Sequence, residues 1–160
     1  MPVFFSNKFF VTLIIAILVV RTWSCAAANR STPSGYIGSE SCAICHAEEY
    51  RSFVTYAKKS RSFESIERLK KGLSDDEIRR CYSCHTTGYG RPGGFVNSKT
   101  TPRLKNAGCE VCHGPGALHA RTSKAMHIKK HLSMADCEVC HTSERVTAFR
   151  YKPLIHGGAH

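Results

Sequence analysis

Four cysteine-histidine runs carry the chemistry that this sequence can support. Each has the pattern Cys-x-x-Cys-His, and they occupy residues 42–46, 81–85, 109–113 and 137–141. Cysteines at i and i+3 of a helical turn project to one side, where they reach the two vinyl groups on one porphyrin edge, and the next residue lies under the iron. This pattern is the attachment signature of c-type haem, with the histidine as proximal ligand. We therefore predict four covalent haem c groups, attached through Cys42, Cys45, Cys81, Cys84, Cys109, Cys112, Cys137 and Cys140 and ligated by His46, His85, His113 and His141.

Two other interpretations of the cysteines explain less of the pattern. Paired Cys-x-x-Cys runs can build tetrahedral zinc sites, but such sites do not need a histidine directly after every second cysteine. A disulfide framework is the second alternative for an exported chain rich in cysteine. All eight cysteines after residue 28 fall within the motifs, and a bridge within one helical turn would constrain little. Haem attachment accounts for the cysteines and the histidines together.

The sixth ligand of each iron decides what the haems can do. A second histidine closes the iron for electron transfer at low potential, a methionine raises the potential, and an open position binds small ligands. The chain has five histidines outside the motifs, and we expect about three of them to ligate iron. His119, which follows the third motif, is the first candidate, and His160 and His156 come next.

The other possible ligands are weaker candidates. His127 and His131 flank Lys129 and Lys130, and this charge indicates a solvent-facing helix. Methionine ligation would have to come from residue 126 or 134. The residue types alone leave two alternatives: every iron has a sixth ligand, or one iron lacks it.

Residues 1–28 have the pattern of an export signal. Lys8 precedes the apolar run Phe9–Val20, and Ala26–Ala28 forms a small-residue cleavage site. The run is too short for a membrane span, which needs about 20 apolar residues. We expect cleavage, a periplasmic or extracellular location, and a tetrahaem domain over 29–160. Lipidation of Cys25, the one cysteine of nine that lies outside the motifs, is left open.

The strong positive charge does not indicate a nucleic-acid partner. The formal net charge is +11, but the propionates of four haems would offset most of it. The lysines and arginines are spread along the chain rather than gathered in one stripe, and no aromatic residues alternate with them as a base-stacking platform would require. We expect redox proteins as partners.

The elements predicted around the first two motifs are short helices. The stretch Ser39–Lys59 is predicted to be helical, with Tyr50, Phe53 and Tyr56 at helical spacing as a face that packs on haem. A second short helix carries Phe63, Ile66 and Leu69 and stops at Gly72. A capping box at Ser74–Glu77 begins a third helix that leads into Cys81.

The second half of the chain is predicted to contain more loop. Thr86–Thr101 is rich in Gly, Pro, Ser and Thr and is expected to be a connector. A helix over Pro115–Lys130 would place His127 and His131 one turn apart on one face. Ser133–Asp136 is expected to cap the helix of the fourth motif. The predicted fold is mainly α with extensive irregular loops, a compact multihaem cytochrome fold around four stacked haems.

Three stretches of the sequence, together with His119, match the pattern of a known family. They are Tyr36-Ile37-Gly38-Ser39-Glu40-Ser41-Cys42, Cys81-Tyr82-Ser83-Cys84-His85-Thr86-Thr87-Gly88-Tyr89-Gly90, and Gly108-Cys109-Glu110-Val111-Cys112-His113-Gly114-Pro115-Gly116. Through these residues the sequence resembles the cytochrome c-554 family of multihaem cytochromes over about Tyr36 to His160. This resemblance implies a mainly helical fold around closely stacked haems, electron transfer outside the cytoplasm, and a five-coordinate iron in some members. It also implies that His119 is the distal ligand of a neighbouring haem.

One position departs from the family pattern. Relatives tend to have a histidine in the segment after the first motif, where this chain has Arg61. Arginine stays protonated and cannot ligate iron. Either another histidine, such as His156 or His131, fills that role, or one haem is open.

The function predicted from these features is electron transfer between redox partners, with no side chain acting as a catalyst. The enzyme alternative is reduction of a small nitrogen oxide at an open haem. A third possibility is a haem-carrying subunit of a larger electron-transfer complex or filament, including a homo-oligomer.

Overall fold

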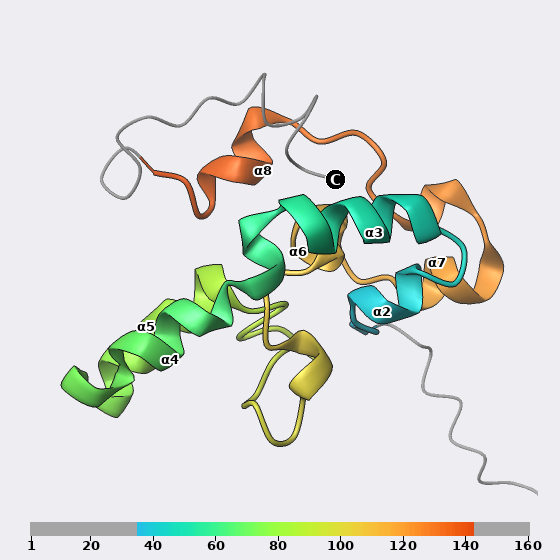
Figure 1. Ribbon diagram of the computed structural model, residues 1–160. Helices are drawn as coiled ribbons and strands as arrows, with labels where there is room; N and C mark the ends of the chain where they lie inside the picture. The colour runs from blue at the N-terminus through green and yellow to red at the C-terminus, as the bar shows by residue number, and fades with distance from the viewer. Residues whose placement is uncertain (1–34, 143–160) are drawn as a thin grey trace, which may run out of the picture. The chain divides into compact units, whose positions relative to one another are not determined.

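Short helices joined by irregular segments form the part of the chain that the computed structural model describes, residues 35–142 (Figure 1). No strand occurs within those residues, so the predicted class, mainly α with extensive loops, is confirmed. The export signal predicted at 1–28 and the candidate ligands His156 and His160 lie outside the described residues. The α-helices are α2 (Ser39–Cys42), α3 (Ala47–Tyr56), α4 (Phe63–Leu69), α5 (Asp75–His85), α6 (Cys109–His113), α7 (Ala117–Thr122) and α8 (Met134–Glu138). The 3₁₀ turns are η2 (Lys58–Arg61), η3 (Lys70–Gly72), η4 (Pro102–Leu104) and η5 (Ala125–His127).

Two of these helices begin at the capping boxes that the sequence predicts. At α5, Glu77 N donates to Ser74 Oγ at 3.4 Å, and Ser74 N donates to a carboxylate oxygen of Glu77 at 2.9 Å. At α8, Ser133 N donates to Asp136 Oδ2 at 2.8 Å. Each box satisfies backbone donors that a helix start leaves free. The caps therefore fix the beginnings of the helices that carry the second and fourth motifs.

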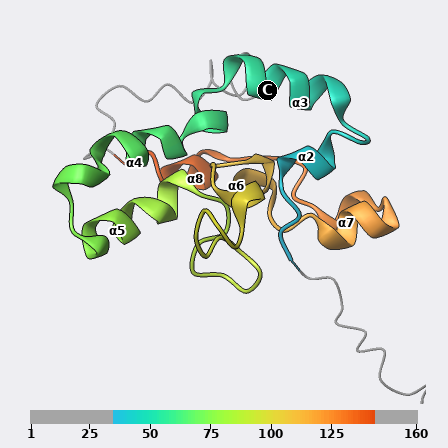
Figure 2. The ribbon, with the colours of Figure 1, turned by 60° about the horizontal axis from the view of Figure 1, so that its bottom comes forward.

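The main apolar cluster joins α4 and α5, which lie side by side (Figure 2), to the loop after them. Its buried members are Phe63 and Ile66 of α4, Phe95 of the loop and Leu104 of η4. The Phe63 and Phe95 rings are 5.8 Å apart between centroids, and Tyr82 of α5 meets Phe95 edge-on at 5.1 Å. Aromatic packing of this kind adds to simple area burial. The second motif is thus carried by the best-packed part of the described chain.

Two predicted apolar faces are only partly buried. Phe53 of α3 is 5% exposed, whereas Tyr56 is 76% exposed. In α4, Ile66 is 3% exposed and Leu69 63%. Residues six apart on a helix are rotated by about 120° from each other, so a third residue at this spacing leaves the face that the first two share. This rotation explains why Tyr56 and Leu69 are exposed on the protein surface, and the packing of the Tyr50, Phe53 and Tyr56 face on haem stays a prediction.

The helix predicted over 115–130 is broken in the structure. α7 ends at Thr122, and Ser123 has φ 54°, the left-handed conformation that stops a helix. A 3₁₀ turn, η5, follows, and His131 lies in a bend beyond it. His127 and His131 therefore do not share one helix face.

The loop predicted over 86–101 is tied down by its first residues. Thr87 N donates to Leu104 O at 2.9 Å, and Phe95 N donates to Thr87 O at 2.9 Å. The buried Thr87 hydroxyl donates to Asn106 O at 2.6 Å and accepts from Gly108 N at 2.9 Å. These bonds connect the end of α5 to the segment that enters α6, so the loop fixes the second motif relative to the third.

Candidate haem-attachment sites

All four Cys-x-x-Cys-His motifs lie on single helical turns. The second motif forms the last turn of α5, and the third is α6 itself. In the first motif His46 N donates to Cys42 O at 2.9 Å, and in the fourth His141 N donates to Cys137 O at 2.9 Å, which closes the same turn. The two cysteines of each motif therefore project to one side of the turn, as attachment to one porphyrin edge requires. No disulfide joins any of the eight described cysteines.

Main-chain carbonyls hold several histidines in the form that binds metal. His85 Nδ1 lies 2.9 Å from Ser62 O, and His113 Nδ1 lies 2.7 Å from Lys129 O. His119 Nδ1 lies 3.0 Å from Lys124 O. A carbonyl can only accept, so Nδ1 carries the proton in each ring, and Nε2 keeps the lone pair that a metal needs.

Two histidines from distant segments of the chain lie close together. The rings of His46 and His119 lie 6.2 Å apart between centroids, with 28° between their planes. With metal–nitrogen bonds of about 2 Å and about 1.1 Å from nitrogen to ring centre, two imidazoles on opposite sides of one metal have centroids about 6.2 Å apart. The separation of the His46 and His119 ring centres matches this value, so these two histidines would be able to hold one haem iron between them. His119, the first candidate from the sequence, lies opposite the proximal histidine of the first motif.

The first and third motifs also meet through their attachment cysteines. A hydrogen bond joins the Cys42 and Cys109 thiols; it raises the pKa of Cys42 and lowers that of Cys109, while burial raises both. Cys109 N donates to Ser39 Oγ at 3.0 Å, and a Cβ on Gly108 would meet that oxygen at 2.3 Å. The close approach of α2 and α6 thus brings the attachment points of the first and third motifs together.

The fourth motif has a more open environment. His141 and Val139 are exposed, Val139 by 75%. Partial burial, with Lys59 nearby, lowers the pKa of His141, which favours the neutral ring that can bind iron. Lys129 connects this motif to the third: its main chain bonds with His113, and its ammonium pairs with Asp136 in the cap of α8.

The remaining candidates from the sequence are dispersed. His127 lies in η5, where its Nδ1 is 2.7 Å from Thr122 Oγ1. His131 and Met126 are exposed, and Met134 is half exposed at the start of α8. Arg61 is exposed at the end of η2, directly before the residue that holds His85. The structure does not bring this set of side chains together.

The sequence did not single out two residues that shape these sites. Ser62 accepts from His85 Nδ1 through its carbonyl and donates its hydroxyl to His85 O at 2.8 Å. Glu110, inside the third motif, is 3% exposed. Glu138 holds the same place in the fourth motif, which has the same five residues, and it is exposed. The local sequence therefore does not indicate that Glu110 is buried.

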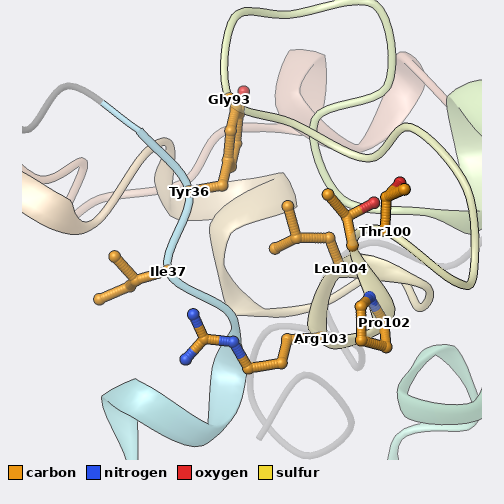
Figure 3. Close-up of a pocket in the computed structure, with 8 residues that line it drawn as sticks. Tyr36, Ile37, Gly93, Thr100, Pro102, Arg103 and Leu104 are labelled. Carbon is orange, nitrogen blue, oxygen red and sulfur yellow. The ribbon is translucent and has the colours of Figure 1, made fainter.

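One cavity in the described part of the chain lies apart from the four motifs. A cavity of about 160 Å³ lies between Ile37 and η4 (Figure 3), and its lining contains neither cysteine nor histidine. That volume is below the roughly 300 Å³ at which ligand pockets usually begin. Within residues 35–142 no group of three His, Cys, Asp or Glu side chains is arranged to hold a metal ion directly. No helix in the same part of the chain is long and apolar enough to cross a membrane.

Comparison with known proteins shows which proteins the chain is similar to. The family model described as cytochrome c554 and c-prime matches residues 41–114. Cytochrome c-554 of Nitrosomonas europaea is 32% identical over a stretch that covers 49% of this chain and 38% of that protein, so the match spans less than half the length of this relative. The structure of the reduced state of cytochrome c554 from the same organism superposes with a TM-score of 0.58 at 20% identity, covering 80% of this chain and 86% of the other. Over residues 41–114 the chain is therefore similar to the cytochrome c554 family of c-type cytochromes, and this likeness indicates covalently bound haem c.

Proposed function

We propose that the protein is an exported electron carrier with four covalent haem c groups, one at each motif. The support for the number four is that each Cys-x-x-Cys-His run lies on a helical turn and that no disulfide joins the described cysteines. A bound haem supplies a one-electron couple. The chain's own contribution is to attach the haems, to orient the axial histidines and to set their environment.

The facing rings of His46 and His119 carry this proposal. Their 6.2 Å separation suits two histidine ligands of one iron, and a doubly ligated iron is closed to small molecules and suited to electron transfer. The Nδ1 bonds at His85 and His113 prepare these rings in the same way. For the remaining irons we propose His156 and His160 as distal ligands.

Haem content and spin state test the proposal directly. Denaturing electrophoresis with haem staining, together with the mass of the purified holoprotein, is expected to show four attached haems. Electronic and electron paramagnetic resonance spectra are expected to show low-spin iron at the haem of the first motif. Absence of covalent haem would refute the proposal. The mass of the mature chain also reports whether cleavage after Ala28 and export to the periplasm take place.

A nitrogen-oxide reductase is the second candidate, and it is favoured by the surroundings of the second motif. Arg61 stands where relatives tend to have a histidine, and the next residue, Ser62, orients His85. If this iron lacks a sixth ligand, the holoprotein will show a high-spin signal that shifts when nitric oxide is added. Four low-spin irons would exclude this candidate. The solution mass of the holoprotein separates a monomeric shuttle from a subunit of a larger assembly or filament.

A further inference from the structure

Glu110 is a buried carboxylate inside the third motif that takes no part in haem attachment. It is 3% exposed, and both of its oxygens accept hydrogen bonds from main-chain N–H groups. Ile37 N donates at 3.0 and 3.1 Å to the two oxygens, Gly38 N donates at 2.8 Å, and Gly116 N donates at 2.7 Å. A charged group this deeply buried is costly unless such donors satisfy it. The chain keeps it by supplying three backbone donors.

Those donors belong to the two elements that hold the facing histidines. Gly38 is the N-terminal cap of α2, which leads through the first haem cysteine to His46. Gly116 is the N-terminal cap of α7, which carries His119. One carboxylate therefore joins the start of α2 to the start of α7. Glu110 belongs to the third motif, whereas the two histidines that it connects are proposed to ligate the haem of the first motif.

The glycines beside Glu110 fit this close connection. Gly38 has φ 84°, a conformation that other residues rarely adopt. A Cβ on Gly116 would lie 3.1 Å from Glu110 Oε1 and 3.4 Å from Ile37 Cδ1. A side chain at Gly116 would thus press on the Glu110 carboxylate and on Ile37, so we expect changes at Glu110 or Gly116 to shift α7.

We propose that Glu110 is the positioning residue that holds His119 opposite His46, and so sets the axial ligation of the first haem from within the motif of the third. The proposal rests on the proposed function, in which these two histidines ligate one iron. Contacts that orient a metal ligand typically change metal affinity by about 10- to 100-fold when they are removed. Loss of the carboxylate will release α7, and with it His119.

The chain contains a matched control for this residue. Glu138 occupies the same place in the fourth motif, which has the identical sequence Cys-Glu-Val-Cys-His. Its side chain is exposed, and it forms no hydrogen bond with another described residue. The same substitution at the two positions therefore separates the effect of the buried connection from the effect of the motif.

The test uses the full-length holoprotein and measures spin state and cyanide affinity. Glu110→Gln keeps the size of the side chain but turns an acceptor oxygen into a donor that faces backbone N–H groups. We expect one iron to become partly high-spin and to bind cyanide about 10- to 100-fold more tightly. Glu138→Gln is expected to match the wild type. Gly116→Ala, which presses on the carboxylate from α7, is a milder second variant and should shift the same iron less.

Two further variants identify the affected iron. His119→Ala is expected to make one iron fully high-spin, and adding Glu110→Gln to it should not open a second iron, because both changes act on one ligand. If His119→Ala leaves every iron low-spin, the histidine pair of the proposed function is refuted. If His119→Ala opens an iron but Glu110→Gln does not, or if Glu110→Gln yields no holoprotein and Gly116→Ala matches the wild type, the role of Glu110 alone is refuted.

Discussion

The third and fourth motifs have the same five residues but different surroundings. In the third motif Glu110 is buried and accepts from three backbone donors, and Cys109 contacts Cys42 of the first motif. In the fourth motif Glu138 is exposed and Val139 is 75% exposed. The third motif is a junction between α2 and α7, whereas the fourth is held mainly by the cap of α8 and by Lys129. An identical local sequence thus serves as a structural centre at one place and as a peripheral attachment site at the other.

Removing the haem attachment of each motif tests this difference most strongly. Cys109→Ala with Cys112→Ala should reduce the yield of exported holoprotein by more than about tenfold, because the haem and the junction are lost together. Cys137→Ala with Cys140→Ala should leave a folded protein with one haem fewer. Haem staining and mass spectrometry of matched preparations measure both. Equal losses of holoprotein in the two double variants would contradict the proposal that the third motif is a structural centre and the fourth is peripheral.

Truncating the two glutamates gives the next largest difference. Glu110→Ala leaves three backbone donors without a partner, and each unsatisfied buried donor costs about 1–3 kcal/mol, so we expect a loss of about 3 kcal/mol or more in the free energy of unfolding. Glu138→Ala is expected to be neutral because its side chain is in solvent. Urea unfolding of the holoproteins, followed by far-ultraviolet circular dichroism, measures the change. Similar midpoints for the two variants would count against the buried network.

Acid should weaken the cap of α8, which begins the helix of the fourth motif. Hydrogen bonds from Lys129 and then Ser133 hold the pKa of Asp136 at about 2, below the ordinary value of 3.8. A carboxylate with a lowered pKa stabilises the fold fully above its unfolded value, and this contribution is lost as the pH falls through the folded value. We expect amide exchange at the start of α8 to speed up between about pH 4 and pH 2. Asp136→Asn should show fast exchange already at neutral pH, and a wild-type α8 unaffected at pH 2 would refute the idea.

The smallest effect is expected at Lys129. Lys129→Ala removes the ammonium that pairs with Asp136 but keeps the main-chain carbonyl that accepts from His113 Nδ1. Both side chains of the pair are partly in solvent, where ion pairs contribute little and are screened by salt. Spin states should match the wild type, with faster exchange confined to α8. A new high-spin signal in this variant would show that the side chain, rather than the backbone, orients His113.

Local patterns were sufficient to predict much of the fold. The capping boxes at Ser74 and Ser133 were predicted because side chain and backbone partners lie within one turn. The break in the helix after Thr122 was missed, since a left-handed Ser123 has no strong local signal. Tyr56 and Leu69 are exposed in the protein alone, because a spacing of six does not keep residues on one helix face.

The candidate site divides in the same way. The residue types and spacing of the four motifs are sufficient by themselves to indicate haem attachment, because covalent attachment and proximal ligation need only one helical turn. The pairing of His46 with His119, the orientation of His85 by Ser62, and the different roles of Glu110 and Glu138 were decided by tertiary structure. Each depends on a contact between segments far apart in the chain. Identical residues acquire different roles when distant backbone donors reach one of them and not the other.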